Sequence, residues 1–135
     1  MPTSECVCGN IKVEISGDPL ATVVCHCNDC RKISGSAFSF NWMVPQNTVK
    51  ITGETKTFKT TANSGNLVTN HFCGDCGVTL WSNTPATPGL MCLKAGTFND
   101  SKDQNNPHPM SEIFVSRRLG WLSAIPNADQ KKEMD

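Results

Sequence analysis

Residues 25–32, Cys-His-Cys-Asn-Asp-Cys-Arg-Lys, hold the densest group of reactive side chains in the sequence. Three thiols, one imidazole, one carboxylate and two cations fall within these eight residues. Two smaller cysteine pairs flank this cluster at a distance, Cys6-Val-Cys8-Gly9 near the start and Cys73-Gly-Asp-Cys76-Gly77 past the middle. Seven of the eight cysteines therefore belong to three clusters. The chemistry of the protein depends on what these clusters bind.

The spacing of the cysteines favours metal binding over disulfides. Cys6 and Cys8 stand two residues apart, as do Cys25 and Cys27, and such pairs close only strained disulfide rings. Cys27-x-x-Cys30 and Cys73-x-x-Cys76 have the spacing of zinc knuckles. The N-terminus has neither a basic start nor an apolar stretch, so we expect no signal peptide and a cytoplasmic location. In that reducing compartment thiols stay free or bind metal.

Seven thiolates can be divided into one closed and one open metal site. Structural zinc takes four protein ligands, whereas catalytic zinc keeps one position open. In the simplest partition the flanking pairs form a closed structural site from Cys6, Cys8, Cys73 and Cys76. The central cluster then forms an open site from Cys25, Cys27 and Cys30. Ligand counting leaves a swap open, in which 27/30 join 73/76 and 6/8 join 25. Either way, we expect two Zn²⁺ per chain.

An open site with three thiolates is suited to thiol chemistry. Three thiolates leave a zinc site with a charge of about −1, which makes it a weaker activator of water than a three-histidine site. Metal binding deprotonates a thiol whose pKa is otherwise about 8.5. The site could therefore present a substrate thiolate to an aldehyde, or stabilise the thiolate that leaves a carbon–sulfur bond. We expect Arg31 and Lys32 to offset the negative charge and to hold a substrate carboxylate.

The elements that position these residues are predicted to be short strands. Alternating apolar residues at 11–15 predict one strand, and apolar or alternating runs predict the others, at 21–24, 37–44, 49–51, 55–59, 67–72, 78–81, 90–95 and 112–115. Residues 29–35 predict one helical turn that ends at Gly35. The polar stretch 99–109 predicts a surface loop. With no other helix expected, the fold class is mainly β.

Length and charge restrict the classes of protein to which the chain can belong. The 135 residues suit one domain, which we expect over residues 1–126, followed by a flexible tail at 127–135. Twelve basic and twelve acidic residues give a formal net charge of zero, so we expect no nucleic acid and no anionic membrane as partner. No apolar run approaches the ~20 residues of a membrane span.

Motifs over residues 5–122 carry a resemblance to a known family. They are C-x-C-G, C-H-C-x-x-C-R-K followed by Ser34-Gly35 and Phe38, F-C-x-x-C-G, Ala95-Gly-Thr-Phe, Pro109-x-x-Glu-Ile-Phe and Trp121. In this order and spacing they resemble the glutathione-dependent formaldehyde-activating enzyme family, also called the centromere protein V/Gfa domain. The sequence departs from the family at Glu112, where relatives often have His.

The resemblance implies a fold and an activity. It implies an Mss4-like fold of small β-sheets with two zincs, structural at the flanking pairs and catalytic at the central cluster, as ligand counting favours. Members are commonly described as carbon–sulfur lyases or S-(hydroxymethyl)glutathione synthases. The family therefore implies a zinc enzyme that acts on glutathione or similar thiol–carbonyl adducts. The alternative is a non-catalytic zinc module of the same fold that binds a protein partner, but such a module has no need for an open site.

Histidines and Asp29 are the candidate acid–base groups near the clusters, because the chain has no tyrosine. His26 lies between two predicted ligands, and we favour a supporting or packing role over a catalytic one. His71 precedes Cys73 by two residues, and it could donate to a sulfur or lie exposed. His108 lies in the polar stretch and is expected to be solvated.

Apolar residues near the clusters are candidates for a pocket wall. Phe38 and Phe40 share one face of the strand after the central cluster, and we expect Phe38 to contact the substrate. Cys92 lies in an apolar strand and is expected to be a core thiol. The three tryptophans are expected in the core or in the pocket wall, namely Trp42, Trp81 and Trp121.

Overall fold

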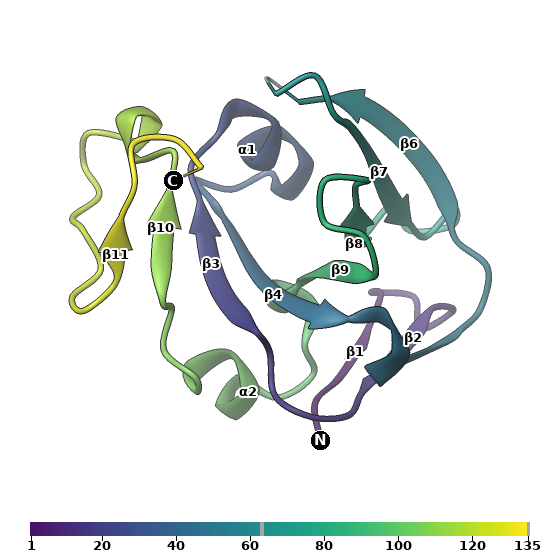
Figure 1. Ribbon diagram of the computed structural model, residues 1–135. Helices are drawn as coiled ribbons and strands as arrows, with labels where there is room; N and C mark the ends of the chain where they lie inside the picture. The colour runs from purple at the N-terminus through teal and green to yellow at the C-terminus, as the bar shows by residue number, and fades with distance from the viewer. Residues whose placement is uncertain (63, 135) are drawn as a thin grey trace.

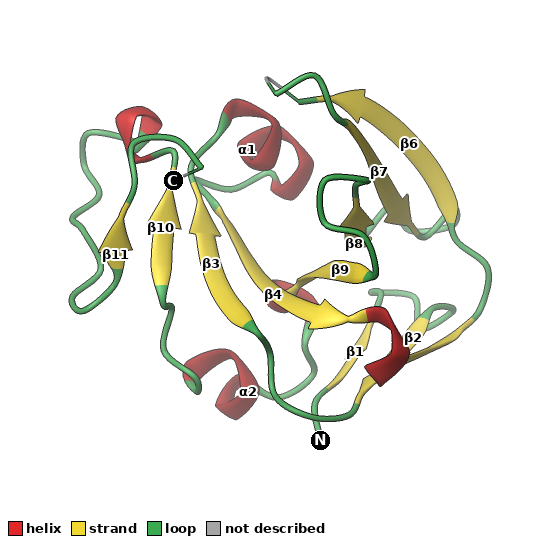
Figure 2. Cartoon of the chain, viewed as in Figure 1, coloured by secondary structure: helices red, strands yellow, loops and turns green. Residues whose placement is uncertain are grey.

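The computed structural model of the protein describes residues 1–62 and 64–134, which form two β-sheets (Figure 1). The strands of the larger sheet lie in the order β11 (Asp129–Gln130), β10 (Ser111–Ile113), β3 (Ala21–Cys25), β4 (Ser39–Pro45), β9 (Leu90–Lys94), β8 (Thr79–Asn83), β7 (Leu67–Phe72) and β6 (Lys56–Thr61). The smaller sheet has the order β1 (Thr3–Glu5), β2 (Lys12–Ile15) and β5 (Val49–Thr52). Strands predominate among the regular elements (Figure 2), which confirms the mainly β class.

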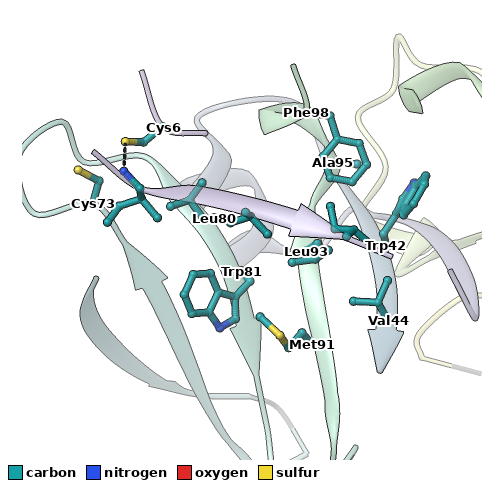
Figure 3. Packing of buried hydrophobic residues seen from close by; sticks show 13 residues of the cluster. Cys6, Trp42, Val44, Cys73, Leu80, Trp81, Met91, Leu93, Ala95 and Phe98 are labelled. Carbon is teal, nitrogen blue, oxygen red and sulfur yellow. Dashed lines mark hydrogen bonds between the residues drawn. The ribbon is translucent and has the colours of Figure 1, made fainter. Parts of the chain in front are cut away.

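The core lies where the smaller sheet packs on the larger one. Ile11, Val13 and Ile15 are buried while the residues between them are exposed, as the two-residue period of a strand requires. They share one cluster with residues of the larger sheet and with two cysteines: Cys6, Trp42, Val44, Cys73, Leu80, Trp81, Met91, Leu93, Ala95 and Phe98. Figure 3 shows Cys6 and Cys73 at one end of this cluster. Two of the predicted metal ligands are therefore fixed to the hydrophobic core.

Two short α-helices connect the strands in the described part of the chain. Helix α1 (Asn28–Ser34) begins after Cys27, whose side chain accepts the N–H of Cys30, and ends at Gly35 with a left-handed φ of 63°. It agrees with the helical turn predicted at 29–35. Helix α2 (Ser101–Asn105) lies within the stretch predicted as a loop, so that prediction was wrong for these five residues. Asp100 is the N-cap of this helix and accepts the N–H of Lys102. One N-cap residue is too weak a signal to predict a helix of five residues from the sequence.

The C-terminal residues extend the larger sheet. Strand β11 pairs in parallel with β10, and the N–H groups of Asp129 and Lys131 donate to the carbonyls of Met110 and Glu112, each at 2.9 Å. Residues 127–134 therefore differ from the flexible tail that we expected, and residue 135 lies outside the described residues. Strand β11 has only two residues, both exposed, so no alternation marks it in the sequence.

The tryptophans have two different environments. Trp42 and Trp81 are buried in the core, as predicted. Trp121 is 73% exposed, so the prediction of a core or pocket role was wrong. It lies in a turn closed by a 3.0 Å hydrogen bond from the Leu122 N–H to the Leu119 carbonyl, and this turn directs the ring to solvent.

One buried carboxylate, Glu112 on β10, joins the C-terminal segment to the sheet. Its Oε2 accepts hydrogen bonds from the Ile125 N–H (2.8 Å), Gln130 Nε2 (2.7 Å) and Arg118 Nη2 (3.2 Å). Its Oε1 lies 2.8 Å from Nε2 of the buried His26. Burial alone would raise the pKa of the Glu112 carboxyl, but these donors and the Arg118 charge together lower it to about 2. The group is therefore ionised at neutral pH.

Replacing Glu112 should destabilise the fold. We expect Glu112→Ala to lower the free energy of unfolding by about 3–5 kcal/mol, because it leaves the buried donors without their acceptor. Glu14→Ala is the control, since Glu14 is exposed and lies 3.9 Å from Lys50, and it should cost less than about 1 kcal/mol. Urea unfolding of the zinc-loaded proteins measures both values.

The effect of Glu112→Ala on the free energy of unfolding also has an expected pH profile. A carboxylate with a lowered pKa stabilises the fold above its ordinary value of 4.5, and this contribution is lost only as the pH falls toward about 2. The difference between wild type and Glu112→Ala should therefore stay constant from about pH 8 to about pH 5.5, within the carboxylate's ionised range. A difference that shrinks across this interval would contradict an ionised Glu112.

Candidate metal centres and the adjoining cavity

Two similar turns form what we call the four-thiol group, which consists of Cys6, Cys8, Cys73 and Cys76. In each turn the glycine after the second cysteine donates its N–H to the carbonyl of the first, from Gly9 to Cys6 at 3.0 Å and from Gly77 to Cys73 at 2.8 Å. Gly9 and Gly77 have φ angles of 80° and 79°, which residues with a side chain rarely adopt. The glycine in each motif thus allows the chain to turn and direct both thiols to one point.

The sulfur positions of the four-thiol group fit a zinc ion. All four Sγ atoms lie within 4.8 Å of one another, and Cys8 Sγ is 3.6 Å from both Cys6 Sγ and Cys73 Sγ. Tetrahedral zinc with Zn–S bonds of about 2.3 Å requires sulfurs about 3.8 Å apart. A disulfide would require about 2.05 Å. The Ile11 N–H donates to Cys6 Sγ at 3.2 Å, a contact that favours the thiolate form that metal binding needs.

The second cluster, the three-thiol group, consists of Cys25, Cys27 and Cys30, whose Sγ atoms also lie within 4.8 Å of one another. Cys25 ends β3, Cys27 is the N-cap of α1, and Cys30 lies in the first turn of that helix. The Cys30 N–H donates to Cys27 Sγ at 3.3 Å. The grouping is that of the simplest partition, and the swapped arrangement does not occur among the described residues.

The three thiols do not ionise independently. Hydrogen bonds from the thiols of Cys25 and Cys30 lower the pKa of Cys27 to about 2. Hydrogen bonding to Cys27 and Cys30 raises the pKa of Cys25 far above its ordinary value. One thiolate is therefore stabilised by the protons of its neighbours, and a second would place like charges within 4.8 Å. A divalent cation would remove this penalty, so the donor set fits zinc here as well.

A cavity of about 530 Å³ adjoins the three-thiol group. Its walls come from α1, β4, the turn before β8 and the end of β9, elements that Figure 1 shows around the middle of the larger sheet. Cys30 lines it, as do Phe38 and Phe40, which agrees with the pocket expected there. Cys76 of the four-thiol group lines it as well, so the cavity adjoins both groups. Its volume suits a small organic ligand.

The cations of the cavity differ from those expected. Neither Arg31 nor Lys32 lines it. The Arg31 guanidinium donates to the Arg117 carbonyl at 2.6 Å and to Asn28 Oδ1 at 2.5 Å, and the Lys32 side chain is exposed. Among the described residues the cation that lines the cavity is Lys94, which sequence reasoning missed. A lysine that ends the apolar strand 90–94 was the signal that could have identified it.

The described histidines lie outside the cavity. His26 is buried beside Glu112, and its ring lies 5.8 Å from that of Phe38, consistent with a supporting or packing role. His71 stacks on Trp81 at 4.4 Å, and its hydrogen bonds go to Thr55 and Asn83. Desolvation lowers the pKa of His71. His108 is exposed and donates to the Pro126 carbonyl at 2.7 Å.

Cys92 and Asp29 also lie apart from the cavity. Cys92 lies on β9 and is half-buried rather than fully within the core. Asp29 is exposed in the first turn of α1.

Among the described residues, neither helix has the length and apolar character that spanning a membrane requires.

Comparison with known proteins gives relatives by fold and by sequence. A crystal structure of a Rhodobacter sphaeroides protein is similar in fold with a TM-score of 0.60 at 13% identity, over 79% of this chain and 96% of that one. A Penicillium rubens protein is 25% identical over 130 residues. Its name assigns it provisionally as a glutathione-dependent formaldehyde-activating enzyme. The match covers 96% of this chain but 64% of that relative's length.

A family model described as glutathione-dependent formaldehyde-activating enzyme matches residues 1–117. The matched range contains all seven cysteines of the two thiol groups, and it extends from the first strand to the residues after Glu112. It confirms the resemblance carried by the cysteine motifs. The chain belongs to the glutathione-dependent formaldehyde-activating enzyme family.

Proposed function

We propose that the protein is a zinc-dependent carbon–sulfur lyase, or a synthase in the reverse direction, that acts on glutathione or similar thiol–carbonyl adducts. The observation that carries this proposal is the difference between the two thiol groups. The four-thiol group has the full ligand number of a structural zinc, whereas the three-thiol group lacks one ligand and adjoins the cavity through Cys30. Family membership supports the same assignment.

Each group of residues has a role in this proposal. Cys25, Cys27 and Cys30 would hold the catalytic zinc, which when bound keeps the substrate sulfur in its thiolate form. Phe38 and Phe40 would exclude water from the reacting carbon. In the synthase direction the sulfur forms a bond to the carbonyl carbon, the π electron pair moves to oxygen, and the thiol proton ends on that oxygen. The lyase direction reverses each change, so no further reactant is needed.

The fold type, the cellular location and the domain organisation belong to the same proposal. We infer an Mss4-like fold, a cytoplasmic location and a single catalytic domain. The strand-rich architecture and the two thiol groups support the first of these. The absence of a membrane-spanning helix among the described residues is compatible with the second. Small-molecule thiols are the proposed partners.

Metal content is the first prediction. Protein purified without added metal should contain close to two zinc ions per chain by elemental analysis, because seven converging thiols offer two sites. A mild chelator should remove one ion first, since the three-thiol group has fewer ligands. A content near one after gentle purification, with no recovery when zinc is added, would contradict the open site.

Serine substitutions should separate the two sites. Cys8→Ser removes the sulfur that lies 3.6 Å from those of Cys6 and Cys73, and should lower the melting temperature by more than about 10 °C because a crosslink between distant segments is lost. Cys27→Ser should leave a folded chain, since serine is also a good N-cap for α1. That variant should lose one zinc ion and at least about 100-fold in the rate of adduct formation.

Calorimetry, elemental analysis and NMR with ¹³C-labelled formaldehyde and glutathione measure these effects. Cys92→Ser is the matched control, because Cys92 belongs to neither thiol group. Unfolding by Cys27→Ser without unfolding by Cys8→Ser would show that the structural and catalytic roles are reversed.

Cobalt substitution tests whether the substrate sulfur reaches the metal. Thiolate-rich sites prefer soft sulfur over hard oxygen, so glutathione should intensify the sulfur-to-cobalt charge-transfer bands of the Co²⁺ protein. The matching tripeptide with serine in place of cysteine should leave them unchanged. If neither glutathione nor any small thiol alters the spectrum, direct thiol ligation is wrong, and the non-catalytic binding module becomes the better interpretation.

A further inference from the structure

We propose that Lys94 forms an anion subsite in the cavity, which binds a carboxylate of the substrate while the three-thiol group holds its sulfur. This inference deepens the proposed function, on which it rests for the position of the sulfur. It also specifies the substrate class, a thiol–carbonyl adduct that carries a carboxylate. The subsite replaces the role that we expected for Arg31 and Lys32.

The register of three neighbouring strands places Lys94 beside the three-thiol group. On β4, Ser39 lies opposite Cys25 of β3, and Asn41 lies opposite Lys94 of β9. Ser39 and Asn41 are two residues apart, so their side chains lie on the same face of the sheet. Lys94, Ser39 and Cys30 line the same cavity. The lysine and the candidate metal ligand are therefore parts of one site.

A buried amide holds the ammonium group in place. Lys94 Nζ donates to Asn41 Oδ1 at 3.0 Å. The amide nitrogen of Asn41 donates to Ser39 Oγ at 2.9 Å and to the Val23 carbonyl at 3.2 Å, which fixes the orientation of the amide. Asn41 and Ser39 are each only 4% exposed. The lysine side chain is thus oriented before any ligand binds, which lowers the entropic cost of binding.

The ammonium group retains binding capacity. It has three N–H donors, and Asn41 accepts one of them. None of the ion pairs between described residues involves Lys94, and none of the residues that line the cavity is acidic. A cation without an acidic partner, half-buried in a cavity that Phe38 also lines, favours an anion. Its two remaining donors match the two oxygens of a carboxylate.

The test compares thiols that differ by one carboxylate. The Co²⁺ protein is titrated with N-acetylcysteine and with N-acetylcysteamine, which lacks the carboxylate, and the charge-transfer bands report binding. Wild type should bind N-acetylcysteine at least about tenfold more tightly. Lys94→Met should bring the two affinities within about twofold of each other by weakening N-acetylcysteine alone, and Lys94→Arg should retain most of the preference.

A second arm identifies the source of the carboxylate. Adduct formation with glutathione is followed by NMR for formaldehyde and for glyoxylate, which adds a carboxylate on the carbonyl side. If wild type prefers glyoxylate over formaldehyde and Lys94→Met removes that preference, the subsite binds the carboxylate of the carbonyl partner. If a preference is seen only between the two thiols, the subsite binds the carboxylate of the thiol. Lys50→Met is the control, because Lys50 is exposed on β5, and it should change neither preference.

A third arm separates this inference from thiol ligation. Calorimetry with 3-phenylpropionate, which has no sulfur, should give binding that Lys94→Met weakens by about tenfold. If no thiol alters the cobalt spectrum but this binding is observed, thiol ligation fails and the anion subsite stands.

Other outcomes overturn the subsite. Suppose that wild type binds both thiols with equal affinity, and that Lys94→Met changes neither adduct formation with glyoxylate nor the affinity for 3-phenylpropionate. Thiol ligation then stands and the subsite is wrong. Loss of the preference in Arg31→Ala instead of Lys94→Met would overturn it too. Melting temperature and cobalt content of each variant verify that the chain is folded and loaded.

Discussion

The convergence of four thiols from two distant turns is the constraint on which the rest of the structure depends. Cys6 and Cys8 lie at the start of the chain, and Cys73 lies 65 residues after Cys8, yet the sulfurs of Cys8 and Cys73 are 3.6 Å apart. Metal bonds at this point would crosslink the smaller sheet to the larger one. In a chain of 135 residues, whose core is necessarily small, such a crosslink adds stability that apolar burial alone supplies less readily.

This crosslink also shapes the cavity. The turn that carries Cys73 and Cys76 continues through Gly77, Val78 and Thr79, and the last three residues line the cavity together with Cys76. One wall of the candidate catalytic site is therefore built on the candidate structural site. Because Cys73 is buried in the core next to Cys6, the position of this wall depends on the same packing that supports the sheets. Stability and the shape of the site are thus linked in this fold.

Local patterns in the sequence predicted the features that depend on local geometry. The alternation of Ile11, Val13 and Ile15 marks a strand with one buried face, and the glycine after each cysteine pair marks a tight turn. The simplest partition, which keeps the central cysteine cluster together, has the grouping found in the structure, although ligand counting alone left the swapped arrangement open. These features follow from periodicity and stereochemistry within a few residues.

The features that the sequence did not reveal depend on contacts between distant segments. Lys94 faces the cavity because β9 pairs with β4, and its partner Asn41 lies 53 residues earlier in the chain. Strand β11 is too short to show alternation and exists through its pairing with β10. Glu112 looks like an isolated acidic residue in an apolar strand, and its four donors come from four different segments. Strand order and register, which spacing along the chain does not encode, decide all three.

The charges around the cavity explain why an unpaired lysine is useful there. A zinc ion with three thiolates has a net charge of about −1, and a substrate thiolate as fourth ligand would bring it to about −2. Lys94 is the cation that lines the cavity among the described residues, and it is held by a neutral amide. An acidic partner in place of Asn41 would cancel the lysine charge and repel the carboxylate of an incoming ligand. A neutral hydrogen-bond acceptor orients the lysine and leaves its charge available, so Asn41 keeps the site electrostatically suited to an anionic ligand.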